Sequence, residues 1–110
     1  MLKKFLAMAF AIITAAALSF ASPALADGAA TFTANCNACH GGGLNYINPT
    51  ATLSKADLEK NGKYSLDAII TQVTYGKAPM PAFGGRLSDE AIAEVAEFVL
   101  SQADAGWPPY

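Results

Sequence analysis

Apolar residues recur at helical spacing in two stretches of the second half of the chain. One predicted helix begins after Ser65 and ends at Gly76, and its apolar face consists of Leu66, Ile69, Ile70 and Val73. The last predicted helix begins after Ser88, with Asp89 and Glu90 in its first turn at the positive end of the helix dipole. Its buried stripe consists of Ile92, Val95, Ala96, Val99 and Leu100.

Two further helices are predicted in the first half. Asp27 is a candidate cap for a helix that runs to about Asn35. Ser54, followed three residues later by Asp57, is a capping-box pattern for a short helix that Asn61 would end. No segment alternates between apolar and polar positions, so the chain is predicted to be all-α.

Three segments are predicted to lack regular structure. Gly41-Gly42-Gly43 opens an irregular loop over residues 41–53. Residues 77–85 contain two prolines that flank Met80, and these remove backbone donors and fix the backbone around the methionine. Residues 104–110, which include Gly106 and two prolines, are expected to be a tail.

The N-terminus has the pattern of a removable export signal over residues 1–26. It has two lysines at positions 3 and 4, continues with an apolar run over residues 5–20 and ends in a small-residue site at residues 24–26. A membrane anchor is the alternative, but the run falls short of the ~20 apolar residues of a spanning helix. Because there is no twin arginine, we expect the general secretory route, with one domain at residues 27–110.

The mature chain needs something beyond its own core. Removing 26 of 110 residues leaves 84, and small domains bury too little surface to be stable without help. The two cysteines are so close in sequence that a disulfide would close almost no loop. A large planar apolar cofactor is therefore the better candidate.

Charge restricts the partners. The chain has seven basic and nine acidic residues; without Lys3 and Lys4, five basic and nine acidic residues remain, a net charge of −4. This charge disfavours nucleic acid as a partner. A protein partner with a basic docking patch fits this charge, with an attraction that salt weakens.

The segment Cys36-Asn37-Ala38-Cys39-His40 has the spacing that attaches haem covalently. Cys36 and Cys39 are the only cysteines, and His40 is the only histidine. Met80 is the only methionine beyond the N-terminal apolar segment. If one haem c is bound, its axial ligands are therefore His40 and Met80 by elimination.

Other uses of these residues fit less well. A structural zinc site needs four ligands, and residues 27–110 contain no further Cys or His. A thioredoxin-type thiol–disulfide catalyst needs a strand before its Cys-x-x-Cys, and none is predicted. Met80 as an ordinary gap-filling core residue is disfavoured by its place between two prolines.

A His/Met pair leaves no open iron position, so we predict an electron-transfer protein and not an enzyme. An axial imidazole also needs an outer partner, for which Pro49 or a neighbouring carbonyl is a candidate.

At these residues the chain resembles the cytochrome c6 family, the small soluble photosynthetic cytochromes of cyanobacteria and algae. The similarity extends over nearly all of residues 27–107. It rests on the Cys36–His40 motif, the three glycines that follow it, residues 64–70, residues 80–87 and Trp107. The block over residues 80–87 is far more specific than the haem motif, which indicates only a c-type cytochrome.

The resemblance implies a class I cytochrome c fold, with about four helices wrapped around one haem and the first and last helices crossing at Gly28 and Phe32. It implies a shuttle in the thylakoid lumen that takes an electron from the cytochrome b6-f complex and gives it to photosystem I, and sometimes to a terminal oxidase. It also suggests that Gln72 lies near the haem and tunes its potential, and that Arg86 aids docking on photosystem I.

Two features depart from the family pattern. Pro79 precedes the methionine, and residues 108–110 extend past the common end. These departures leave room for a divergent c6-like paralogue. A periplasmic cytochrome c that feeds an oxidase is the nearest alternative function.

Overall fold

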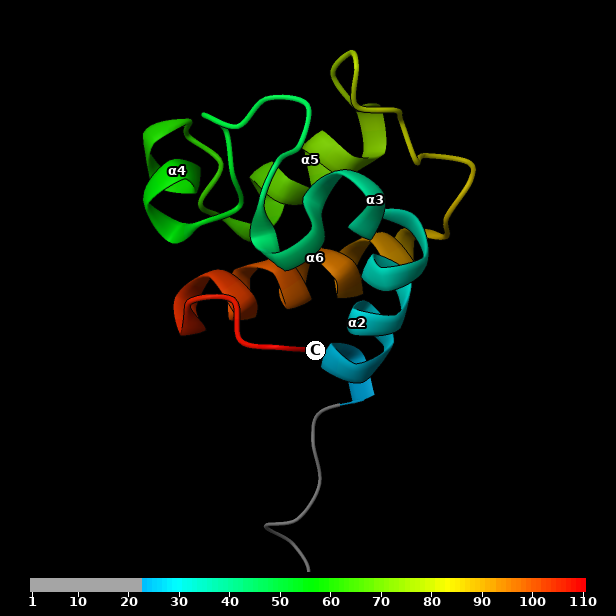
Figure 1. The fold of residues 1–110 in the computed structure, drawn as a ribbon. Coiled ribbons are helices and arrows are strands. Elements are labelled where there is room, and N and C mark those ends of the chain that lie inside the picture. The colour runs from blue at the N-terminus through cyan, green and yellow to red at the C-terminus, as the bar shows by residue number, and fades with distance from the viewer. Residues whose placement is uncertain (1–22) are drawn as a thin grey trace, which may run out of the picture.

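The computed structural model describes residues 23–110, which form five α-helices and one 3-10 helix. They are α2 (Pro23–Asn35), α3 (Asn37–His40), η1 (Gly41–Gly43), α4 (Lys55–Lys60), α5 (Leu66–Tyr75) and α6 (Asp89–Ala105). Within these residues there is no strand, only two isolated bridges. The all-α prediction is confirmed. Figure 1 shows α3, α4 and α5 on one side of α6, with the start of α2 on the other.

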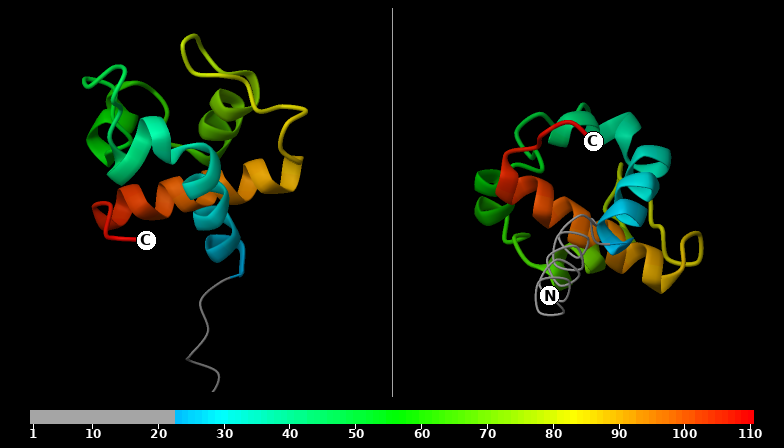
Figure 2. Two further views of the ribbon diagram at one scale, coloured as in Figure 1. Left: turned by 45° about the vertical axis from the view of Figure 1, so that its right-hand side comes forward. Right: turned by 90° about the horizontal axis from the view of Figure 1, so that it is seen from below.

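The first and last long helices cross at a glycine, as expected. A Cβ atom on Gly28 of α2 would lie 2.4 Å from the carbonyl oxygen of Glu94 and 2.8 Å from Cβ of Phe98 in α6. No side chain fits there, so the close approach of the two backbones requires glycine. One turn later Phe32 is 1% exposed, and its ring centroid is 5.3 Å from that of Phe98. Figure 2 shows the two helices crossing.

The start of the first helix differs from the prediction. α2 begins at Pro23 and not after Asp27. Proline suits the first turn of a helix because its φ is already helical, and the Ala24-Leu25-Ala26 segment that follows consists of strong helix formers. Asp27 is therefore inside the helix and does not cap it. Of the predicted signal segment, residues 1–22 lie outside the described residues.

α4 has the predicted bounds but a different capping network. The Oγ of Ser54 accepts a hydrogen bond from the backbone N–H of Asp57 at 3.1 Å. The carboxylate of Asp57 does not reach back to Ser54; it accepts from the backbone N–H of Thr52 at 3.0 Å and from its hydroxyl at 2.6 Å. The side chain of Asp57 therefore closes the loop that precedes α4. The two hydrogen bonds from Thr52 lower the pKa of its carboxyl group.

α5 and α6 are capped as predicted. Ser65 accepts a hydrogen bond from the N–H of Ala68, and Ser88 from that of Ala91, both at 3.1 Å. α6 continues two residues into the segment predicted as a tail, because the glycine that ends it adopts a left-handed conformation only at position 106. Its buried face differs from the predicted stripe, because Leu100 is only half-buried and three further residues are buried. The buried residues are Ile92, Val95, Ala96, Phe98, Val99, Gln102 and Ala103.

Candidate haem site

The cysteine motif forms a single helical turn at the end of α2. The N–H of Cys36 donates to the carbonyl oxygen of Phe32 at 2.8 Å, and the N–H of His40 donates to that of Cys36 at 2.9 Å. Two of the following glycines, Gly42 and Gly43, have φ angles of 65° and 79° and end the turn. Both thiols and the imidazole are thus presented by one short turn.

The imidazole of His40 is oriented by a backbone carbonyl. Its Nδ1 lies 2.9 Å from the carbonyl oxygen of Leu44. When Nδ1 carries the proton and donates it to this oxygen, the lone pair of Nε2 is available to a metal. The outer partner that the sequence left open is therefore Leu44 and not Pro49.

Met80 lies in the methionine strap, which we define as residues 76–87 between α5 and α6. A pair of backbone hydrogen bonds joins Lys77 and Met80, from Lys77 N–H at 3.1 Å and from Met80 N–H at 2.8 Å. The N–H groups of residues 83 and 84 donate to carbonyl oxygens of residues 73 and 74 at 2.9 and 3.0 Å. The strap is therefore fixed by its own turn and by the end of α5.

Gln72 and Arg86 occupy different surroundings. Gln72, a half-buried residue of α5, places its Nε2 3.6 Å from the sulfur of Met80. Arg86 is exposed, and its guanidinium carbon lies 5.0 Å from the ring centroid of Phe83. The structure thus brings Gln72 to the candidate iron ligand and leaves Arg86 on the surface.

Cys36, Cys39, His40, Gln72 and Met80 all line one cavity of about 480 Å³. This volume is within the range of cofactor sites. Much of the remaining wall is apolar, with Phe32, Leu58, Ile69, Val73, Phe83, Val95 and Val99. A planar apolar cofactor fits this wall, and imidazole and thioether are donors that haem iron accepts. The residues present therefore fit haem.

The electrostatics of Cys36 do not suit a thiol–disulfide catalyst. Burial, followed by the charge of Cys39, raises the pKa of the Cys36 thiol to about 11. Reactive thiols of such catalysts have lowered pKa values. The structure therefore disfavours this alternative.

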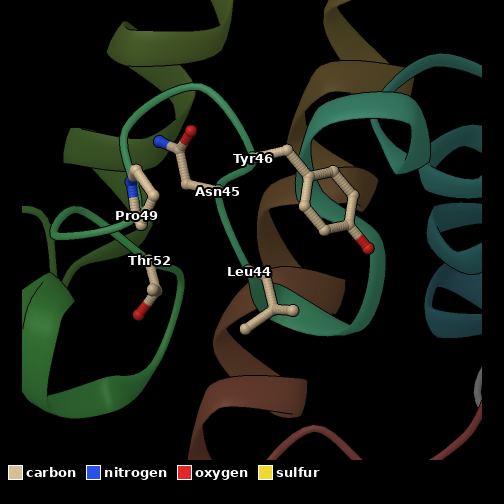
Figure 3. A pocket seen from close by; sticks show the side chains of 5 residues that line it. All are labelled: Leu44, Asn45, Tyr46, Pro49 and Thr52. Atoms are coloured by element: carbon tan, nitrogen blue, oxygen red, sulfur yellow. The ribbon is translucent and has the colours of Figure 1, made fainter.

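Sequence reasoning missed two lysines near the site. Lys63 and Lys77 also line the cavity and bring positive charge to it. Surface lysines are common, so no sequence signal could have found them. A second, smaller pocket of about 200 Å³ lies on the loop after η1 and is lined by Leu44, Asn45, Tyr46, Pro49 and Thr52 (Figure 3). It contains Pro49 but none of the residues predicted to bind haem or iron.

Comparisons with known proteins show the family of the chain. Residues 23–99 match a family model described as cytochrome c oxidase, cbb3-type, subunit III. The chain is 54% identical to cytochrome c6 of Rippkaea orientalis over 110 residues, which cover 96% of this chain and 99% of that protein.

Two solved structures extend the comparison. The structure of cytochrome c6 from the diatom Phaeodactylum tricornutum matches with a TM-score of 0.74 and 54% identity, over 76% of this chain and 98% of that one. Oxidized cytochrome c6A from Arabidopsis thaliana matches with a TM-score of 0.79 and 39% identity, over 82% and 100%.

The fold and the cysteine motif together define a class I c-type cytochrome, a carrier of electrons with one covalently bound haem. The 54% sequence identity to cytochrome c6 of Rippkaea orientalis, over nearly the whole length of both chains, identifies one family within this class. The chain belongs to the cytochrome c6 family. None of the helices formed by residues 23–110 combines the length and apolar character needed to cross a membrane.

Proposed function

We propose that Cys36 and Cys39 hold the haem through thioether bonds, and that His40 and Met80 are its two axial iron ligands. The observation that carries this proposal is that all four side chains line one cavity. When bound, the haem supplies the one-electron redox chemistry of iron, and a His/Met pair raises its potential. The chain contributes an oriented imidazole, a fixed sulfur and apolar walls that exclude water.

Two measurements test this site. Alkylation of the unfolded protein is expected to modify no thiol, because both sulfurs are in thioether bonds; two reactive thiols would contradict the proposal. The ferrous holoprotein is expected not to bind carbon monoxide, because both axial positions are filled. Rapid binding of the gas would show an open iron position and would favour an enzyme.

We infer that the chain carries electrons from the cytochrome b6-f complex to photosystem I in the thylakoid lumen. The similarity to cytochrome c6 supports this, and so does the arrangement of charge. All five basic residues of positions 27–110 fall within residues 55–86, whereas α6 carries five acidic residues and no basic one. Such a charge distribution orients a small protein as it approaches its partner. Exposed Arg86 is the proposed docking residue and requires an acidic group on photosystem I.

The experiment is the re-reduction of flash-oxidised photosystem I by the reduced holoprotein. We expect the rate to rise with protein concentration and to fall when Arg86 is replaced by glutamine. Lys55→Gln is the matched control, since this lysine lies over the ring of Tyr64 at 5.3 Å, on α4. A rate no faster than that of an arbitrary small cytochrome of equal charge would contradict the photosystem assignment.

Donation to a terminal oxidase is the second candidate, and the match to the cbb3-type subunit model favours it. The two roles are separated by comparing photosystem I re-reduction with oxygen uptake by membranes that contain a terminal oxidase. Faster oxygen uptake would support the oxidase role. Two fast reactions would indicate that the carrier serves both acceptors.

We also propose that residues 1–26 are a signal peptide that directs export to the lumen. Mass spectrometry of the protein from its native membrane system is expected to give a mature chain that begins at Asp27 and carries one haem. A chain that retains residues 1–26 would contradict this proposal.

A further inference from the structure

The residues after α6 fold back along the molecule instead of extending from it. The side chain of Gln102, which is 8% exposed, donates from Nε2 to the carbonyl oxygen of Pro108 at 2.7 Å. The N–H of Trp107 donates to the carbonyl oxygen of Gln102 at 2.8 Å. A buried amide side chain thus determines where residues 106–110 run, and Figure 1 shows this segment beside α2.

Trp107 lies directly against the turn that ends the cysteine motif. A Cβ atom on Gly43 would be 2.3 Å from the Trp107 ring, so this ring packs on the bare backbone. The indole Nε1 donates to the carbonyl oxygen of Leu53 at 2.8 Å, and the N–H of Leu53 donates to that of Gly43 at 2.8 Å. Trp107 therefore fixes both ends of the loop between Gly43 and Leu53.

Tyr110 contacts both sides of the His40 turn with a single hydroxyl group. This hydroxyl donates to Oδ1 of Asn37 at 2.6 Å and accepts from the N–H of Gly42 at 3.1 Å. Asn37 lies between the two cysteines, and Gly42 lies two residues beyond His40. The ring of Tyr110 packs edge-on against Phe32 and Phe98, with centroids 5.6 and 5.3 Å apart.

We propose that Tyr110 is a positioning residue for the haem-attachment turn. It touches neither candidate iron ligand, but its hydroxyl joins the side chain of Asn37 to the backbone N–H of Gly42, on either side of His40, while its ring packs against Phe32 of α2 and Phe98 of α6. The turn that carries His40 is thereby held in a fixed position relative to α2 and α6. The hydrogen bond between His40 Nδ1 and the carbonyl oxygen of Leu44 depends on the position of this turn, because the flexible residues Gly42 and Gly43 link His40 to Leu44. This inference rests on the proposed roles of Cys36, Cys39 and His40.

The experiment is hydrogen exchange by NMR on the ferrous holoprotein. Tyr110→Phe removes the hydroxyl and retains the ring, so the fold is preserved. We expect exchange of the Gly42 N–H to accelerate roughly fivefold, the effect of losing one hydrogen bond. The Nδ1–H of His40 is expected to exchange faster as well, whereas the amides of Ile69 and Val73 in α5 keep their rates.

The control is Tyr75→Phe, which removes a hydroxyl from a tyrosine that is 76% exposed. It is expected to change none of these rates. An unchanged Gly42 rate in Tyr110→Phe would overturn the proposal, and so would an equal acceleration at Ile69 and Val73, which would indicate general destabilisation. A wild-type protein without attached haem would instead refute the proposed function, and this is seen before any variant is measured.

Discussion

The segments that carry the two candidate iron ligands are held in different ways. The turn with His40 is contacted by residues far along the chain, namely Trp107 and Tyr110. The methionine strap is fixed by its immediate neighbours, through the turn between Lys77 and Met80 and two bonds to the end of α5. One ligand therefore depends on tertiary packing and the other on local backbone structure.

This difference matches the chemistry of the two ligands. An imidazole beside two thioether bonds stays near the iron whether or not its turn is well packed. A neutral thioether is a weaker ligand, so its binding depends on a strap that already holds the sulfur in place. We therefore expect damage to the strap to remove the sulfur without unfolding the protein, and damage to the His40 turn to reduce stability.

Replacing each ligand in turn has the largest expected effect. His40→Ala is expected to yield no stable holoprotein, because the chain has no other histidine. Met80→Ala is expected to keep its haem, lose the near-infrared sulfur-to-ferric-iron absorption and fall in potential by on the order of a few hundred mV, within the range that axial ligands cover. Absorption spectra and redox titration measure both outcomes. An unchanged near-infrared band in Met80→Ala would identify a different ligand.

Two glycine variants test the comparison directly. A Cβ atom on Gly43 would meet Trp107 at 2.3 Å, and one on Gly76 would meet the Met80 carbonyl oxygen at 2.7 Å. Gly43→Ala is expected to lower the free energy of unfolding by about 3 kcal/mol, since the left-handed conformation costs about 1–2 kcal/mol and the clash adds to it. Gly76→Ala is expected to abolish the near-infrared band.

The matched controls are Gly42→Ala and Gly85→Ala, which have φ angles of 65° and 82° and no atom within 4 Å of the added Cβ. They measure the cost of a positive φ without a clash. Gly76 has in addition a ψ of −179°, a conformation essentially restricted to glycine, so its conformational cost is larger than that of the controls. Guanidinium chloride unfolding and near-infrared spectra of all four variants complete the test. Loss of the band in Gly43→Ala but not in Gly76→Ala would reverse the comparison.

Gln72→Leu is expected to lower the reduction potential by about 40 mV. A hydrogen bond to the Met80 sulfur reduces its electron donation and so favours ferrous iron. One such bond is worth about 1 kcal/mol, and 59 mV corresponds to 1.4 kcal/mol for one electron. Thr71→Val, an exposed neighbour on α5, is the control. A rise in potential would show that Gln72 does not act through the sulfur.

Asp57→Asn has the smallest expected effect, on the loop that follows the His40 turn. The hydrogen bonds from Thr52 lower the pKa of Asp57 below its usual 3.8. Because the folded-state pKa is the lower one, the stabilisation is complete above the unfolded-state pKa and is lost as the pH falls through the folded-state pKa. The melting temperature of the wild type should therefore exceed that of the variant at neutral pH, with a gap that closes below about pH 4.

Asp67→Asn is the control, since Asp67 also lies in the first turn of its helix. Thermal unfolding between neutral pH and pH 2 provides the comparison. A gap for Asp57→Asn that widens on acidification would contradict the assignment.

The sequence predicted those features that depend on local interactions. The caps at Ser54, Ser65 and Ser88 each bond to a backbone group three residues away, so a short pattern suffices to identify them. Spacing alone likewise identified the Cys36–His40 motif. The predicted start of α2 was wrong because Asp27 was taken as its cap, whereas the helix begins four residues earlier at Pro23.

The features that the sequence could not predict depend on distant contacts. The hydroxyl of Tyr110 reaches the amide of Gly42 across 68 positions, and no local pattern records such a pairing. Phe98 was missed from the buried stripe because it faces α2 across the Gly28 crossing and not the face predicted from spacing. The partner of His40 was undecided because every backbone carbonyl looks alike in a sequence.

The crossing at Gly28 has a consequence for how the protein matures. α2 packs against Glu94 and Phe98, which emerge late when a chain is threaded amino end first. Until α6 has formed, the turn after α2 lacks this support, and we expect Cys36 and Cys39 to be accessible for the proposed haem attachment. We therefore expect haem attachment to precede the packing of α6 against α2.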